Sequence, residues 1–122
     1  DVLTALTTDN ELSAPAPETA AILAGGTVGT HLQMGIGDGV IPGILNQQIY
    51  DHIYIVSDEE AIRTSKDLAR LEGLMCGISS GTNVAAALQL AKKLGKGKTV
   101  VTVLPDTAER YFSTPLFENE TK

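Results

Sequence analysis

Residues 105–111 hold the densest group of side chains able to do chemistry: a hydroxyl, two carboxylates, a guanidinium and a phenol. They follow the apolar run 99–104, which has the composition of a buried strand. Ligands of open parallel sheets bind beyond the carboxyl ends of the strands, so this turn is the first place to expect a binding site. The same spacing also suits a solvated turn in which Asp106 or Thr107 caps a short helix.

A second candidate is the glycine-rich segment 35–39, which reads Gly-Ile-Gly-Asp-Gly. Glycines allow a backbone to approach a ligand closely. A dinucleotide-binding loop is not expected, because the preceding residues make a poor strand and Pro42 follows too soon for a helix. Asp38 would also repel a phosphate group. A loop that contacts another kind of ligand and a plain glycine turn both remain open.

A third candidate is the segment 77–81, Gly-Ile-Ser-Ser-Gly, which opens a predicted helix. Its backbone N–H groups could bind an anion at the positive end of the helix dipole. Alternatively, Ser79 or Ser80 caps the helix, and the glycines permit close packing against a strand. Neither serine is expected to act as a nucleophile, since neither sits in a G-x-S-x-G elbow.

The histidines and the cysteine carry weaker signals. His31 and His52 have no metal-ligand spacing, so no metal site is predicted. Cys76 is the only cysteine and sits in an apolar run, where a buried, unreactive thiol is expected. A single cysteine excludes an internal disulfide, which favours a reducing compartment, the cytoplasm.

The elements that would position these residues follow from local patterns. Residues 53–56 are apolar and β-branched, which predicts a buried strand. Ser57 and Glu60 form a capping box for a helix that ends at Gly73. A second helix runs from Ser79 or Ser80 to the glycine at position 95, before the strand 99–104. This order predicts an α/β fold with parallel strands.

The chain divides into two parts in this prediction. Residues 1–26 are expected to be an irregular N-terminal segment with one short helix near 18–24, because Pro15 and Pro17 are turn signals. Residues 27–122 form the α/β portion. Two or three strands make a thin sheet, which normally needs further elements to cover both faces. The sequence therefore predicts an incomplete portion of a larger domain.

Charge and hydropathy exclude some classes of partner. The chain has 9 basic and 15 acidic residues and a net charge of −6, which argues against binding to nucleic acid or an anionic membrane. No apolar run approaches the roughly 20 residues of a membrane-spanning helix. The first residues also lack the pattern of a secretory signal.

Several of these segments recur in order in the cysteine synthases of the pyridoxal-phosphate enzymes of fold type II, which the chain resembles over residues 17–117. Residues 31–42 are similar to that family's H-K-I-Q-G-I-G-A-G-F-I-P, and residues 104–114 to its L-P-D-T-G-E-R-Y-L-S-T. The likeness indicates the C-terminal part of such an enzyme. The other matching segments are 17–26, 58–61, 72–74, 77–81 and 84–87.

The resemblance implies a three-layer α/β domain with a parallel sheet, of which this chain is an incomplete portion. It implies pyridoxal 5'-phosphate as the cofactor and a β-replacement reaction. In that reaction O-acetylserine loses acetate, and sulfide adds to give L-cysteine. The partner is then a small amino-acid substrate, and the intact enzyme is expected to be a homodimer.

The resemblance also assigns cofactor contacts. Thr107 matches the position whose hydroxyl hydrogen-bonds the pyridine nitrogen, and Gly35 and Gly37 match the loop that lines the cofactor pocket. No catalytic residue is expected in this chain, because the family's Schiff-base lysine, phosphate loop and carboxylate loop have no counterpart in it. We therefore expect the chain alone to be inactive. The lysines outside the family's motif are Lys66, Lys92, Lys93, Lys96, Lys98 and Lys122.

Three residues depart from the family pattern. Met34 replaces a glutamine and Asp38 replaces an alanine, and both changes bear on substrate preference. Ala108 replaces a glycine, which would cost about 1 kcal/mol or more if that position required a positive φ. Two alternatives stay open: a portion of a cystathionine β-synthase-type enzyme, and a truncated homologue acting as a non-catalytic interaction module.

Overall fold

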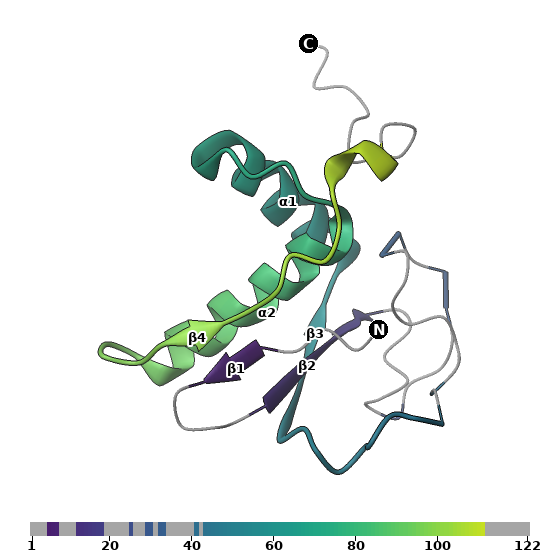
Figure 1. The fold of residues 1–122 in the computed structure, drawn as a ribbon, viewed down its shortest axis with the longest axis vertical. Helices are drawn as coiled ribbons and strands as arrows, with labels where there is room; N and C mark the ends of the chain where they lie inside the picture. Colours follow the sequence, from purple (N-terminus) through teal and green to yellow (C-terminus); the bar gives the residue numbers. More distant parts are fainter. Residues whose placement is uncertain are drawn as a thin grey trace.

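Four strands and two α-helices make up the described part of this computed structural model (Figure 1). The structure describes residues 5–7, 12–18, 25, 29–30, 32–33, 41 and 43–111, with the backbone alone for 5–7, 110 and 111. The elements in chain order are β1 (Ala5–Thr7), β2 (Leu12–Pro17), β3 (His52–Val56), α1 (Asp58–Glu72), α2 (Ile78–Leu94), β4 (Val100–Val101) and a 3-10 helix (Ala108–Tyr111).

The strands form one sheet in the order β3-β2-β1-β4. β2 and β3 pair in parallel, from Ser13 opposite His52 to Pro17 opposite Val56. β1 is antiparallel to both of its neighbours, β2 and β4. Three of the four strands therefore run in the same direction, as the predicted α/β fold requires, and β1 alone runs against them.

The prediction of irregular structure for residues 1–26 is wrong for two stretches, because β1 and β2 lie within it. Pro15 and Pro17 suggested a linker, yet both lie inside β2. β1 pairs with β2 only as far as Ser13, so both prolines lie beyond that pairing, where a missing N–H breaks no ladder bond. A short helix was predicted near residues 18–24. Only residue 18 of this stretch is described, in a 3-10 conformation, so the prediction falls outside the described residues.

The strand predicted over 99–104 is much shorter in the structure, where β4 holds only Val100 and Val101. Its ladder partner β1 is three residues long, and the pairing consists of Leu6 opposite Val101 and Thr7 opposite Val100. Beyond Val101 the chain bonds to α2 instead, since Asn83 Nδ2 donates to the Val103 carbonyl at 2.7 Å.

Helix α1 begins and ends at the predicted residues. The Ser57 hydroxyl accepts from the Glu60 N–H at 3.2 Å, and Gly73 ends the helix in the left-handed conformation at φ 71°. Three acidic residues in the first turn suit the positive end of the helix dipole. The Glu60 carboxylate, which a capping box would turn back to Ser57, accepts from Gln89 Nε2 of α2 at 3.4 Å.

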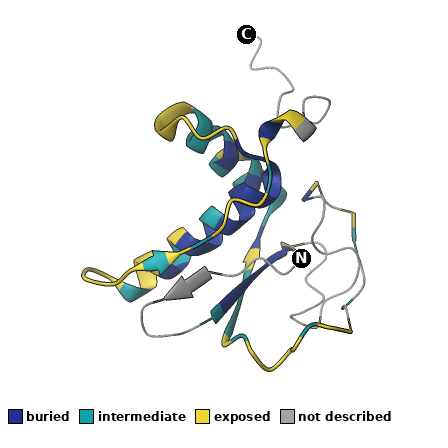
Figure 2. Ribbon diagram, in the orientation of Figure 1, coloured by how far each residue is buried: buried dark blue, intermediate teal, exposed yellow. Residues whose placement is uncertain are grey.

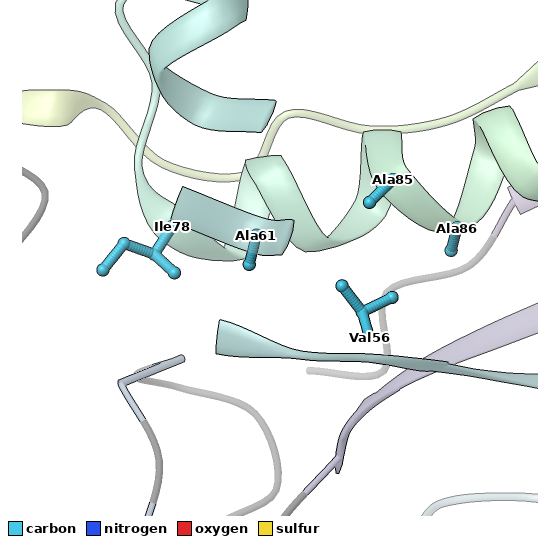
Figure 3. Packing of buried hydrophobic residues seen from close by; sticks show 5 residues of the cluster. All are labelled: Val56, Ala61, Ile78, Ala85 and Ala86. Carbon is cyan, nitrogen blue, oxygen red and sulfur yellow. The ribbon is translucent and has the colours of Figure 1, made fainter. Parts of the chain in front are cut away.

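Helix α2 lies against all four strands and carries α1 on its other side. Its N-cap is Gly77, so the prediction that Ser79 or Ser80 caps the helix is wrong. Both serines lie inside the first turn and are buried. Figure 3 shows Val56 of β3 pointing at Ala85 and Ala86 of α2. The cluster is completed by Ala61 and Ile78.

Small residues let the two helices approach closely. A Cβ added to Gly81 of α2 would lie 2.1 Å from the Ala61 carbonyl oxygen and 3.0 Å from the Ser65 nitrogen, both backbone atoms of α1. Ser65 uses this proximity, because its hydroxyl donates to the Gly77 carbonyl at the start of α2. The glycine predicted to permit close packing therefore faces a helix rather than a strand.

The described residues place helices on one face of the sheet, which gives two of the three expected layers. Figure 2 shows buried residues along β2 and the first half of α2, with exposed residues at the far end of α2. Large apolar side chains at Ile55, Val101 and Val103 remain exposed. No described helix is both long enough and apolar enough to cross a membrane.

Candidate functional site

The turn that carries Thr107 is held by residues 75 and 76, which directly precede α2. Thr107 pairs with Cys76 in an isolated antiparallel bridge, and the Ala108 N–H donates to the Met75 carbonyl at 3.3 Å. Thr107 itself is exposed. Thr107 is thus an exposed residue on a backbone that Cys76 and Met75 hold in place.

The neighbouring residue, Asp106, binds the opening of α2. Its Oδ1 accepts from the Ser80 hydroxyl at 2.6 Å, and its carbonyl accepts from the Gly77 N–H at 3.3 Å. The helix dipole favours a carboxylate at this end. The Asp106 carboxylate therefore lies at the first turn of α2, within the segment 77–81 that was considered as an anion site, and it contacts a side-chain hydroxyl there.

Ala108 fits its position without strain. It is 3% exposed and is the first residue of a 3-10 helix, a conformation with negative φ. The cost expected if this position needed a positive φ therefore does not arise. The alternative of a solvated turn followed by a short helix is partly correct, because the 3-10 helix exists while its first residue is buried.

Cys76 lies beneath the turn, and it is buried as predicted. Burial raises the pKa of its thiol, the hydrogen bond to the Ser65 hydroxyl opposes that rise, and the Asp106 carboxylate adds to it. The thiol therefore stays protonated at neutral pH. Its bridge to Thr107 makes it part of the support of the turn.

A second buried junction lies where residues 32–33 meet the two helices. Gln33 is fully buried, and its Nε2 donates to the Val56 carbonyl at 3.1 Å and to Asp58 Oδ1 at 2.8 Å. Its Oε1 accepts from the Thr82 hydroxyl at 2.7 Å. The Leu32 N–H donates to Asp58 Oδ2 at 2.8 Å. One amide therefore joins segment 32–33 to β3, α1 and α2.

Gly35 and Gly37 lie outside the described residues, so their predicted contacts with a cofactor stay predictions. The described residue Gln33 fixes the chain two positions before Gly35. Thr82, which binds Gln33, and Ser80, which binds Asp106, are two residues apart on α2. The first turns of α2 therefore bind both segments that precede the predicted contacts.

Sequence patterns missed Gln33, Thr82 and Asn83. Each is a polar residue exposed by no more than 1%. The run Thr82-Asn83 directly before the apolar segment 84–88 was the available signal, because buried polar side chains need partners. Their partners lie 20 and 49 residues away in sequence, at distances that local spacing does not reveal.

The remaining candidates do not form a metal site within the described part of the chain, where no cluster of three potential ligands occurs. His52 lies in β3 with its ring edge-on to Tyr54, at 6.5 Å between ring centroids. His31 lies outside the described residues. Lys92 and Lys93 lie in the last turn of α2 and are exposed.

Comparison with known proteins adds independent information. A family model described as pyridoxal-phosphate dependent enzyme matches residues 7–106. A cysteine synthase from Staphylococcus aureus (strain N315) is 52% identical over 107 residues, which are 88% of this chain and 34% of that protein. The chain thus spans about a third of the length of the curated relatives it matches.

Solved structures give the same result for the fold. The crystal structure of a cysteine synthase from Entamoeba histolytica matches with a TM-score of 0.88 and 35% identity, over 93% of this chain and 34% of that one. An O-acetylserine dependent cystathionine beta-synthase from Helicobacter pylori matches with a TM-score of 0.82 and 38% identity, over 88% and 35% of the two chains.

Proposed function

Because this chain belongs to the family of pyridoxal-phosphate dependent enzymes, we propose that it is a portion of a cysteine synthase. The whole enzyme would convert O-acetylserine and sulfide to L-cysteine and acetate. The observation that carries this proposal is the 52% identity to cysteine synthases across 88% of the chain. Assignment to the C-terminal part of the enzyme stays a prediction, and the complete coding sequence tests it.

The residues of the Thr107 turn suit the ring end of pyridoxal phosphate. The cofactor, when bound, supplies an electron sink for β-replacement. Thr107 is exposed, on a backbone held by Cys76 and Met75, and its hydroxyl would bind the ring nitrogen. The nearest carboxylate, Asp106, accepts from Ser80. A neutral hydroxyl rather than a charged group would therefore face the ring. Gly35 and Gly37 would line the same pocket.

Variants of Thr107 in the complete enzyme test this assignment. Thr107→Ser keeps the hydroxyl and should retain cysteine formation and the visible spectrum of the bound cofactor. Thr107→Val keeps the shape and removes the hydroxyl, so kcat/KM should fall about tenfold, the effect of roughly one hydrogen bond. Equal rates and spectra for the two variants would remove Thr107 from the site.

We propose further that the chain alone neither anchors the cofactor covalently nor catalyses the reaction. Thr107 lies beside Gly77 at the start of α2, whereas Lys92 is fifteen residues along that helix, roughly 22 Å at about 1.5 Å per residue. Lys96 and Lys98 lie beyond the end of α2. The purified chain mixed with pyridoxal phosphate should give no stable visible band. Borohydride trapping of the cofactor on Lys66 or another lysine of this chain would contradict the proposal.

The nucleophile separates the two enzymatic candidates. The likeness to an O-acetylserine dependent cystathionine beta-synthase of Helicobacter pylori leaves homocysteine as an alternative to sulfide. The complete enzyme should consume O-acetylserine with sulfide at a higher kcat/KM than with homocysteine. The reverse order would favour the cystathionine β-synthase-type reaction. We also propose a cytoplasmic homodimer for the whole enzyme, which sedimentation and fractionation of the native protein test.

A further inference from the structure

We propose that Thr82 and Ser80 of α2 are positioning residues that set the two cofactor-contacting segments independently of each other. Thr82 acts through Gln33 on the segment that leads to Gly35, and Ser80 acts through Asp106 on the turn of Thr107. This inference rests on the proposed function, and it concerns residues that would not themselves touch the cofactor.

Thr82 acts on the side-chain amide of Gln33, whose orientation is set by hydrogen bonds at both its oxygen and its nitrogen. Gln33 accepts from Thr82 through Oε1, and its Nε2 donates to Val56 and Asp58. The side chain is fully buried, so none of these bonds can be replaced by bulk water at no cost. Asp58 receives the Leu32 N–H as well. Loss of the Thr82 hydroxyl would leave Oε1 of Gln33 without that donor and loosen the place where the chain approaches Gly35.

The Ser80 arm ends at the residue before Thr107. The Ser80 hydroxyl lies 2.6 Å from Asp106 Oδ1 and 3.3 Å from the Asp106 carbonyl oxygen. The same carbonyl accepts from the Gly77 N–H. Ser80 is fully buried, which keeps its hydroxyl on Asp106. Its loss would weaken the support of the backbone that presents Thr107, without a direct effect on Gln33.

Both arms start from one helix within a single turn, yet they reach different segments. Residues 80 and 82 are two positions apart, so their side chains leave α2 in different directions. A merely structural role would make loss of either hydroxyl loosen the whole core. Separate positioning roles instead predict that each loss is felt on its own segment.

Hydrogen exchange on the complete enzyme without cofactor tests this separation. Thr82→Val is isosteric and should speed exchange of the Leu32 amide roughly fivefold, with little change at Gly77 and Ala108. Ser80→Ala should speed exchange of the Gly77 and Ala108 amides, with little change at the Leu32 amide. Thr82→Ser, which keeps the hydroxyl, should restore the wild-type rate at Leu32. Equal acceleration at all three amides in both variants would overturn the inference.

Cofactor binding gives the second readout. Both hydroxyl-deleting variants should raise the Kd for pyridoxal phosphate about three- to tenfold. Only Ser80→Ala should shift the visible spectrum, because it acts on the contact to the ring nitrogen. If the wild-type enzyme binds pyridoxal phosphate and both variants match its Kd and spectrum, the inference fails alone. If the wild-type enzyme does not bind pyridoxal phosphate, the proposed function fails and takes the inference with it.

Discussion

Substitution of Gly81 by alanine should destabilise the chain although alanine is the better helix former. Intrinsic helix propensity alone would make Gly81→Ala stabilising by about 1 kcal/mol. The new Cβ, however, would lie 2.1 Å from the Ala61 carbonyl oxygen, which is backbone and cannot rotate away. An ordinary C···O contact is at least about 3.3 Å, so α1 and α2 would have to separate by more than about 1 Å.

The cost follows from what that separation breaks. A gap of about 1 Å forfeits roughly half of the dispersion attraction across the contact, and overpacking of a tight core costs about 1–3 kcal/mol. The hydrogen bond from Ser65 to the Gly77 carbonyl would also lengthen, at about 1 kcal/mol. Set against the gain in propensity of about 1 kcal/mol, the net loss in free energy of unfolding should be about 1–3 kcal/mol.

Urea denaturation followed by circular dichroism measures this loss, with wild type and variants compared at the same chain length. Gly43→Ala is the matched control, since no atom lies within 4 Å of its added Cβ and its φ is ordinary. That variant should stay within about 0.5 kcal/mol of wild type. If Gly81→Ala is as stable as Gly43→Ala, the close approach of the two helices is refuted.

Four further outcomes are expected. Ser57→Ala should lower the free energy of unfolding by about 1 kcal/mol in urea denaturation, because it removes the acceptor for the Glu60 N–H, whereas Ser57→Asp should keep most of it. Gly73→Ala should lower the free energy of unfolding by about 1 kcal/mol in the same assay, because Gly73 has φ 71° and an added Cβ would meet no crowding. A cost near zero would contradict the left-handed cap. Burial raises the pKa of Cys76, so alkylation by iodoacetamide should need a higher pH than alkylation of a free thiol. The folded chain then holds the thiol proton of Cys76 more tightly than the unfolded chain does. The contribution of Cys76 to stability is therefore constant below the pKa of the unfolded chain and declines as the pH rises from there to the pKa of the folded chain. Over that alkaline range, wild type should lose stability relative to Cys76→Ala.

Local sequence patterns predicted the elements whose cause is local. Helix α1 has its cap at Ser57 and its end at Gly73, and β3 lies where an apolar, β-branched run occurs. These features depend on neighbours within a few residues. The resemblance to cysteine synthases likewise predicted the family, which the match over residues 7–106 confirms.

The features that sequence did not predict depend on distant partners. β2 exists in spite of its prolines because β3 pairs along its whole length, and β4 is short because β1 is short. Gln33 appeared as an ordinary polar residue because its partners come from β3, α1 and α2. The contacts predicted for Thr107 follow from resemblance, and only the support of its turn follows from the structure.

Strand β1 has a consequence for shortened forms of this protein. It is the only described strand that joins β4 to the parallel pair, with two register positions on each side. Removal of residues 1–7 would separate β4 from β2 and leave each of these strands with a newly unpaired edge. The segment that leads to Thr107 would then keep its contacts with Asn83 and Ser80 of α2 and with Met75 and Cys76, but not its strand pairing. Loss of β1 would thus affect the support of a site about a hundred residues further along the chain.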